Sequence, residues 1–340
     1  AVHVSDVIAI ADAIDGAIPI TTWTVRTVEA RNAARQRGVA MIFEMIAPSN
    51  CCPALVLHAT PVYVYQMDDS ALRISVANSL ADVDRAGWDA VANPLGERYD
   101  PFISWDFLEA LESSGAAQPE TGWSPHHLII EGPGGDILAA MPLYAKTNSQ
   151  GEFVFDHSWA DAFERAGGSY FPKLLSAVPF TPVTGRRRLV PAGPDQARLK
   201  DSLLAGAVKI AEQNELSSLH LNFLEPNESD GLTQMGLLKR TDQQFHWINN
   251  GYDDFDAFLA ALSSSKRKNL RKERAKAQDG LEFVHLTGDA ISEDHWDAFY
   301  AFYLDTGARK WGSPYLTRST FSLLGERMAD KLLLILALDN

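Results

Sequence analysis

Cysteine is nearly absent from this chain, and the two cysteines present cannot form a common metal site or disulfide framework. Cys51 and Cys52 are adjacent in a sequence of 340 residues. Structural zinc sites need ligand pairs spaced a few residues apart, and disulfide-rich domains need several separated cysteines. We therefore expect no metal, and the reducing cytoplasm as the compartment.

Long apolar runs and an excess of positive charge are also missing. Residues 7–20 are largely apolar, but Asp12 and Asp15 interrupt them and no basic segment precedes them. The sequence therefore predicts neither a membrane span nor a signal peptide. The formal net charge of −14 argues against binding along DNA, because the phosphate backbone would repel such a surface. One local basic site remains compatible with this charge.

Several motifs of common enzyme classes are absent. The sequence contains no GxxxxGK[ST] phosphate loop, no GxSxG nucleophile turn and no paired zinc ligands. These absences argue against nucleotide-dependent kinases, serine hydrolases and zinc enzymes.

The composition is that of a globular protein with room for two domains. Hydrophobic residues make up 46% and charged residues 22% of the 340 residues, which is ordinary for folded chains of this length. Residues 1–70 show no consistent pattern beyond a possible helix at 25–45 and a short strand at 61–66. We expect a first domain over residues 71–250 and a second over 251–340.

The predicted elements indicate an α/β (α+β) fold that repeats a mixed module. In the first domain we expect strands at 72–77, 126–131, 137–146, 152–158, 216–224 and 243–249, with helices at 80–91, after Ser104 and at 199–213. The GPGGD turn joins the second and third of these strands. In the second domain we expect helices at 255–262, 263–278, 295–309 and 317–328, and strands at 281–286 and 332–338. The order strand, helix, helix, strand occurs in both, and the second module ends before its strands are complete.

Four strings of unusual composition carry a family resemblance. They are FDHSWADAFERAGGSYFPKLLSAVPFTPVTG, QFHW, SSSKRKNLRKERAKA and FYLDTGARKWGSPYLT. They resemble the FemAB-like family, described as peptidoglycan biosynthesis/recognition proteins, within the GNAT N-acyltransferase superfamily, over about residues 72–340. The resemblance implies tandem GNAT-like modules with mixed central sheets, the second incomplete.

The resemblance also implies transfer of an acyl or aminoacyl group onto an amine acceptor linked to cell-wall precursors. The donor would be a small molecule, acyl-CoA, or an aminoacyl-tRNA, which makes tRNA a candidate partner. The Arg/Gln-x-x-Gly-x-Gly/Ala signature that binds pyrophosphate in GNAT proteins is missing, and residues 166–168 are a weak substitute. This absence leaves acyl-CoA open to question.

The clearest physical feature is a basic helix. Arg267, Arg271 and Arg274 fall at helical spacing, and Lys268 begins an adjacent row with Lys272 and Lys276. Such a cationic face suits a phosphate-bearing ligand. The alternative is a solvated face that pairs with acids elsewhere in an acidic chain.

Two candidate catalytic residues lie in the longest of the four strings. Asp156, expected at the end of a strand, would remove a proton from the amine nucleophile. Tyr170 would protonate the leaving group or orient the acceptor. The alternatives are a strand-end cap for Asp156 and a core ring with a solvated hydroxyl for Tyr170.

Further candidates follow along the chain. Lys173, Thr181 and Thr184 precede Arg186–Arg188, and together they offer hydrogen-bond donors and positive charge to an anion. The alternative is a rigid connector stiffened by Pro179 and Pro182. His246, expected on an alternating strand, would face opposite its aromatic neighbours into a cleft. Most such histidines are ordinary core or surface residues.

A function without catalysis also fits the sequence. A module that recognises a glycan or peptide would explain both the weak cofactor signature and the incomplete second module. Lys310 and Trp311 are candidates to line the groove of the second GNAT-like module, although an ordinary structural role is the preferred interpretation for both. Transfer of a labelled group would indicate an enzyme, whereas binding without turnover would indicate a recognition module.

Overall fold

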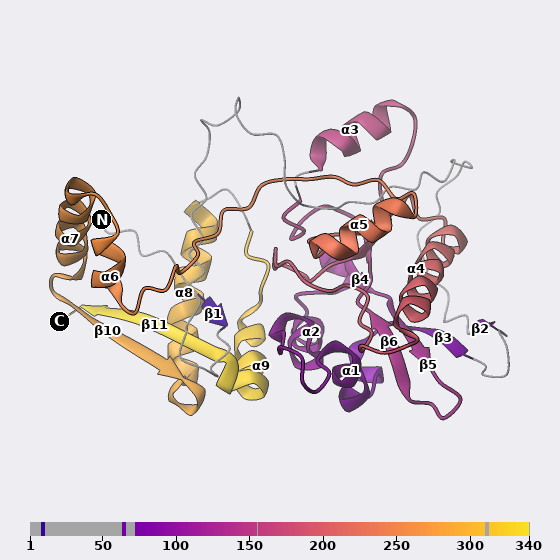
Figure 1. Ribbon diagram of the computed structural model, residues 1–340, viewed down its shortest axis with the longest axis horizontal. Helices are drawn as coiled ribbons and strands as arrows, with labels where there is room; N and C mark the ends of the chain where they lie inside the picture. The colour runs from indigo at the N-terminus through magenta and orange to yellow at the C-terminus, as the bar shows by residue number, and fades with distance from the viewer. Residues whose placement is uncertain (1–7, 11–62, 66–71, 155, 310–312, 340) are drawn as a thin grey trace. The chain divides into compact units, whose positions relative to one another are not determined.

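The chain forms two compact units that combine helices with small sheets (Figure 1). The computed structural model describes residues 8–10, 63–65, 72–154, 156–309 and 313–339. One unit comprises Ala34–Gln243 and Pro314–Leu324, and the other Ala1–Ala33, Gln244–Ser313 and Gly325–Asn340. We call them the large unit and the small unit. The predicted α+β class is confirmed, while the helix expected at 25–45, Lys310 and Trp311 lie outside the described residues.

The first sheet of the large unit is antiparallel throughout. Its strand order is β2 (Tyr63–Tyr65), β3 (Leu72–Ala77), β5 (His127–Glu131) and β6 (Ile137–Met141). The predicted hairpin is confirmed, since Gly135 adopts a φ of +85° in the turn between β5 and β6. The single strand expected over 137–146 is wrong. It breaks at Pro142, which has no backbone N–H for the ladder, and the chain resumes in a second sheet.

The second sheet contains one parallel pair. Its order is β4 (Trp123–Pro125), β7 (Tyr144–Lys146), β8 (Lys173–Ser176) and β9 (Leu219–Leu221), with only the pairing of β8 and β9 parallel among them. Helix α4 (Gln196–Gln213) connects these two strands and packs on β5, β6, β8 and β9 (Figure 1). Its buried positions recur every three or four residues, as an amphipathic helix requires. This packing makes one face of the second sheet part of the hydrophobic core.

The other helices of the large unit begin at local signals. They are η1 (Leu80–Asp82), α1 (Arg85–Ala92), η2 (Pro101–Ile103), α2 (Trp105–Ser113), η3 (Pro119–Thr121), α3 (His157–Arg165) and α5 (Pro226–Gln234). The Ser104 cap is confirmed, because its Oγ accepts the Phe107 N–H at 3.3 Å. The helix expected over 80–91 is divided, because Asp84 caps α1 by accepting the Gly87 N–H at 2.6 Å.

The strand expected over 152–158 is wrong. Gly151 and Phe153 have φ values of +75° and +54°, which turn the chain, and α3 begins at His157. The strand expected over 216–224 is confirmed only as the shorter β9. These differences arise where backbone turns interrupt an apolar run that periodicity alone would continue.

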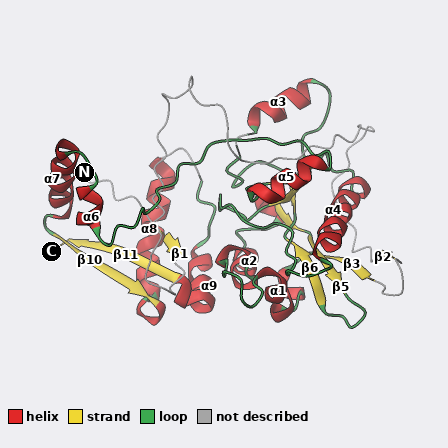
Figure 2. Cartoon of the chain, viewed as in Figure 1, coloured by secondary structure: helices red, strands yellow, loops and turns green. Residues whose placement is uncertain are grey.

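The small unit contains an antiparallel sheet with helices before and between its strands (Figure 2). Its strands are β1 (Ile8–Ile10), β11 (Leu332–Asp339) and β10 (Leu281–Thr287), and its helices are α6 (Phe255–Ala260), α7 (Ser264–Gln278), η4 (Gly288–Ala290), α8 (Glu293–Arg309) and η5 (Ala329–Lys331). Helix α9 (Arg318–Met328) begins in the large unit and ends in the small one. None of the described helices combines the length and apolar character needed to cross a bilayer.

The strand expected over 243–249 is also wrong. Those residues form neither helix nor strand, and no described strand pairs with them. A short alternating pattern becomes a strand only where a partner edge is present.

Candidate functional site

Polar side chains share one buried face of the second sheet. Lys146 on β7 lies opposite Lys173 on β8, and Leu175 lies opposite both Tyr144 and His220. Because side chains alternate along a strand, these five residues point to the same side. We call this side, with Asn222 directly after β9, the polar face. Every one of these residues is buried.

Lys173 holds two carboxylates on this face. Its Nζ donates to Asp156 Oδ2 at 2.7 Å and to Glu152 Oε2 at 2.9 Å, and the side chains of all three residues are fully buried. The Tyr170 hydroxyl donates to the same Asp156 oxygen at 2.8 Å. The structure thus brings together Asp156, Tyr170 and Lys173 from the sequence candidates and adds Glu152.

The Asp156 carboxyl is ionised at neutral pH in this cluster. It occupies the N-cap position of α3 and not the strand end expected from sequence. Burial acts to raise the pKa of Asp156, but the charge of Lys173 and hydrogen bonds from Lys173, Ser149 and Tyr170 outweigh it and lower the pKa to about 2. A carboxylate with such a pKa accepts protons poorly near neutral pH.

Lys146 is the group on the polar face that titrates near neutral pH. Burial lowers its pKa from 10.5 to about 7, against the opposing attraction of Glu152. Its Nζ lies 3.8 Å from the centroid of the Trp123 ring and donates to the Gln150 carbonyl at 3.2 Å. Neither Lys146 nor Glu152 was predicted as a site residue, although a lysine at the end of an apolar strand was a usable signal.

The lowered pKa of Lys146 predicts a rise in stability with pH. Between about pH 7 and 10.5, the unfolded chain holds a proton on this amine that the folded protein lacks, so the unfolding free energy increases across that window. Lys146→Met should remove this rise. Urea unfolding at about pH 6, 8 and 9.5 measures it, with Lys209→Met on the exposed part of α4 as control. A constant difference between wild type and Lys146→Met across this range would contradict the prediction.

Other buried polar atoms on the polar face are not satisfied. Both side-chain polar atoms of Asn222, Glu152 Oε1 and the Tyr144 hydroxyl have no hydrogen-bond partner within the described part of the chain. Buried polar groups in folded proteins are nearly always paired. These atoms are therefore candidates to bind an ordered water or a polar ligand.

His220 is a neutral member of the polar face. Its Nε2 shares a hydrogen bond with Ser218 Oγ at 2.8 Å. Burial, followed by the positive charge of Lys173, lowers its pKa well below the ordinary histidine range. His220 therefore remains an uncharged imidazole at neutral pH, a property that depends on burial and is not visible in the sequence.

The arginines of the loop after β8, which the sequence suggested as an anion site, have partners within the protein. Arg187 donates to the carbonyls of Asn222, Arg186 and Val183 at 3.0, 3.0 and 2.6 Å. Arg188 pairs with Glu228 at 2.8 Å. Arg187 therefore connects the loop to Asn222 at the end of β9, and Arg188 connects it to α5.

The remaining members of this loop also have local roles. Arg186 binds the Ala92 carbonyl at 2.6 Å and Glu97 at 2.8 Å. Thr181 Oγ1 donates to the Pro179 carbonyl at 3.1 Å, which closes a turn, and Thr184 is exposed. The contacts of Thr181 support the rigid-connector interpretation for this part of the loop.

The arginine row of α7 contacts its own unit. Arg267 donates to the Leu262 carbonyl at 3.1 Å, Arg271 pairs with Asp256 at 3.0 Å, and Arg274 lies 4.2 Å from the centroid of the Phe255 ring. This row therefore holds α7 on the segment that contains α6. Any phosphate binding by α7 would fall mainly to the neighbouring lysines.

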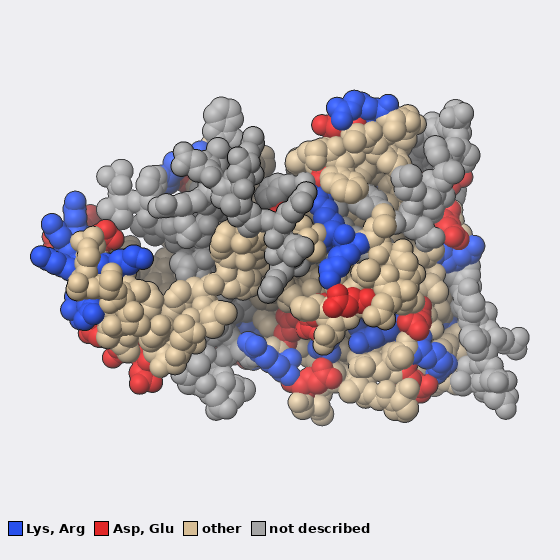
Figure 3. Space-filling model, turned by 45° about the horizontal axis from the view of Figure 1, so that its top comes forward, with Lys and Arg blue, Asp and Glu red and all other residues tan. Residues whose placement is uncertain are grey.

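The lysine row of α7 faces solvent. Lys268, Lys272 and Lys276 are exposed and form no ion pair with any described residue. The basic side chains of the helix gather at the left of the space-filling view (Figure 3). This helix belongs to the small unit, whereas the polar face belongs to the large unit.

His246 also belongs to the small unit. It is exposed, and its Nε2 contacts Gln244 Oε1 at 3.0 Å. Because its segment is not a strand, the alternation that placed His246 opposite its aromatic neighbours does not apply.

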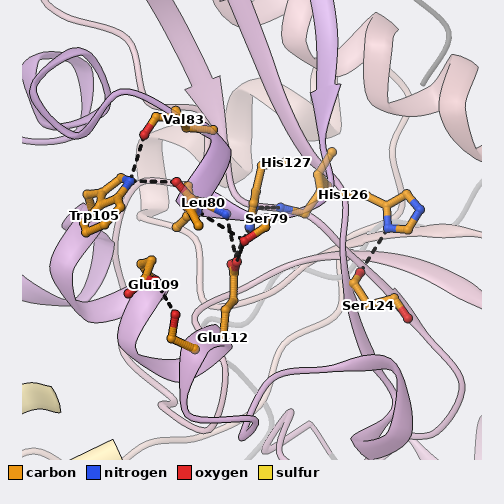
Figure 4. A network of polar contacts seen from close by, with 12 residues as sticks. Ser79, Leu80, Val83, Trp105, Glu109, Glu112, Ser124, His126 and His127 are labelled. Atoms are coloured by element: carbon orange, nitrogen blue, oxygen red, sulfur yellow. Dashed lines mark hydrogen bonds and ion pairs between the residues drawn. The ribbon is translucent and has the colours of Figure 1, made fainter. Parts of the chain in front are cut away.

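A histidine–carboxylate contact between His127 and Glu112 in the large unit has a structural role (Figure 4). His127 Nδ1 accepts the Leu143 N–H at 3.3 Å, so its proton is on Nε2, which donates to Glu112 Oε1 at 2.7 Å. The other Glu112 oxygen accepts from the Leu80 N–H at 2.8 Å. Through these contacts the pair connects α2 to β5 and holds the start of η1.

Removal of this contact should destabilise the large unit. Glu112→Ala leaves the His127 and Leu80 donors buried without their acceptor, which we expect to lower the unfolding free energy by about 1–3 kcal/mol. Chemical denaturation of Glu112→Ala measures this loss, with the exposed Glu120→Ala as control. Equal midpoints for the two variants would contradict a structural role.

Comparison with known proteins places the chain in a family. The family model described as FemAB-like, peptidoglycan biosynthesis/recognition, matches residues 79–340, a range that includes the whole polar face. No curated protein matches the chain. Because the family match covers most of the sequence, this protein belongs to the FemAB-like family, as its four characteristic strings predicted.

Proposed function

We propose that this protein is an N-acyltransferase that moves an acyl or aminoacyl group onto an amine of a cell-wall precursor, with the polar face as its site. The observation that carries this proposal is Lys146, a buried amine with a pKa of about 7 beside the charged cluster of Lys173, Glu152 and Asp156. Groups with pKa values shifted towards neutrality by burial are typical of acid–base catalysis. The family description supports the link to peptidoglycan.

Acyl transfer to an amine needs a proton acceptor and charged groups held in fixed positions around it. The amine nitrogen of the acceptor attacks the carbonyl carbon of the donor, and the neutral Lys146 amine takes the proton that the nucleophile loses. The carbon–sulfur or carbon–oxygen bond of the donor then breaks, and the leaving thiolate or alkoxide takes the proton from the Lys146 ammonium, which restores the neutral amine. Lys173 and its two carboxylates keep the charges around this position fixed, which limits reorganisation during the reaction.

Tyr170 fits a positioning role better than the role of acid. Burial, then the negative charge of Asp156, raises the pKa of Tyr170 far above its ordinary value. A phenol with such a pKa releases its proton reluctantly. Its hydrogen bond to Asp156 instead orients the carboxylate beside Lys173.

The topology of the second sheet supports a GNAT-like module. Strands β8 and β9 are parallel and joined by α4, within a sheet whose other pairs are antiparallel. Strand, helix, strand at this point follows the GNAT order. Lys146 and Lys173 lie at one end of the strands and Asn222 at the other, so the polar face runs their whole length.

A transfer assay tests this proposal directly. The protein is incubated with radiolabelled acyl-CoAs or charged tRNAs and with amine-bearing muropeptide precursors, and products are identified by mass spectrometry. We expect the label on the acceptor amine. Ribonuclease treatment separates the donors, because it abolishes transfer only from tRNA. Acceptor binding without turnover across the panel would refute an enzyme and favour a recognition module.

A further inference from the structure

A column of aromatic rings connects the surface of the large unit to Lys146. Phe153 contacts Tyr315 edge-on at 6.1 Å between ring centroids, Tyr315 stacks on Phe180 at 5.4 Å and 16°, and Phe180 lies 5.2 Å from Trp123. Phe153 and Tyr315 are 43% and 37% exposed, whereas Trp123 is fully buried. Lys146 lies over the Trp123 ring. We call these four rings the aromatic column.

One of the two exposed rings of the column, Tyr315, comes from a distant part of the sequence. Tyr315 belongs to the segment Pro314–Leu324, which is part of the large unit. Three hydroxyls attach this segment to Ser114: Thr317 Oγ1 and Ser319 Oγ donate to its carbonyl at 3.0 and 3.4 Å, and Thr320 Oγ1 donates to its Oγ at 2.8 Å. The position of Tyr315 is therefore supported by hydrogen bonds as well as by its stacking.

The backbone that presents the column is strained. Phe153 and Phe180 have φ values of +54° and +58°, a region that bulky residues rarely adopt. Gly151 permits this arrangement, because a Cβ at that position would overlap the Phe180 ring. Strain of this kind gathers at functional sites, where the surrounding structure maintains it. Here it keeps two phenyl rings in the column and leaves one of them facing solvent.

We propose that Phe153 and Tyr315 bind a pyranose ring of the cell-wall saccharide that carries the acceptor. This inference rests on the proposed function and names the part of the substrate that the protein holds. The C–H face of a sugar fits flat, exposed aromatic surfaces such as those of the two outer rings of the column. Trp123 and Lys146 then lie further along the column, towards the site of transfer.

The surroundings favour an uncharged ring over a nucleotide. A nucleobase would also stack on these rings, but it brings phosphates that need cations. Arg186, Arg187 and Arg188, on the loop that follows Phe180, are already bound to carbonyls and carboxylates. The column is thus better suited to a saccharide than to a phosphorylated ligand.

The test measures binding of the disaccharide GlcNAc–MurNAc by calorimetry, without donor or turnover. We expect Tyr315→Ala and Phe153→Ala to weaken binding about tenfold or more, while Tyr315→Phe, which keeps the stacking ring, retains most of it. Phe245→Ala, an exposed aromatic position of the small unit, is the matched control. Near-UV circular dichroism checks that each variant is folded.

Several outcomes would overturn the inference. They are no disaccharide binding by the wild type, equal binding by wild type and Tyr315→Ala, or tighter binding of adenosine monophosphate that displaces the sugar. Failure of the proposed transferase function can be distinguished from failure of the saccharide site. Saccharide binding without transfer would refute the transferase activity but support the saccharide site. Transfer with an unchanged KM for the acceptor in Tyr315→Ala would refute the saccharide site but support the transferase activity.

Discussion

Lys173→Met is expected to lower the unfolding free energy by about 3–5 kcal/mol. The substitution leaves Glu152 and Asp156 buried without the cation that contacts both of them at 2.9 and 2.7 Å. An uncompensated buried charge is far less favourable than either an intact ion pair or a well-packed apolar group. Urea denaturation, with the midpoint and slope fitted separately, measures the loss.

Two variants separate this effect from simple loss of packing. Lys173→Met combined with Glu152→Gln and Asp156→Asn should recover much of the lost stability, because no buried charge then remains unpaired. Lys209→Met, at an exposed position of α4, should change stability little. A Lys173→Met protein with the wild-type midpoint would show that the charged cluster is not a stabilising element.

Lys146→Met is expected to reduce transfer roughly 10²–10⁴-fold, the usual contribution of a general base. The neutral amine is the active form, so the wild-type rate should rise as pH increases through about 7. The variant should lose this ascending limb, because methionine carries no titrating group. Rates measured from about pH 5.5 to 9 at saturating donor test both points.

Controls for this prediction use other residues of the same unit. Lys209→Met should retain both the rate and the ascending limb. Asp156→Asn should affect stability more than pH dependence, because the pKa of Asp156 is already about 2. If the transfer rate of Lys146→Met still rose with pH through about 7, the proton transfer would belong to another group. An unchanged transfer rate would refute the role of Lys146 altogether.

Much of the fold follows from local signals in the sequence. The basic run of α7 predicted a helix, and its observed range of Ser264–Gln278 matches the expected 263–278. The hydroxyl of Ser104 predicted the start of α2, and the GPGGD turn predicted the β5–β6 hairpin. In each case, the residues that determine the structure are close in the chain, so the interactions that they specify are visible in sequence.

Predictions of individual functional contacts were less complete. Asp156, Tyr170 and Lys173 were named as candidates and lie together, but Lys146 and Glu152 were not named. The three arginines after Thr184 suggested an anion site, yet their partners include Glu97 and Glu228, which are about 40 or more residues away in the chain. A list of charged residues does not reveal which charges are already satisfied.

The sequence by itself determined the family, the mixed α/β class, and the helices and turns that nearby residues encode. Only the tertiary structure decided that Lys146 faces Lys173 across two strands and that Tyr315 joins the rings of the large unit. The reason is physical. Local propensity acts over one turn or one strand, whereas burial shifts a pKa, and stacking assembles a column, only after distant segments have packed together.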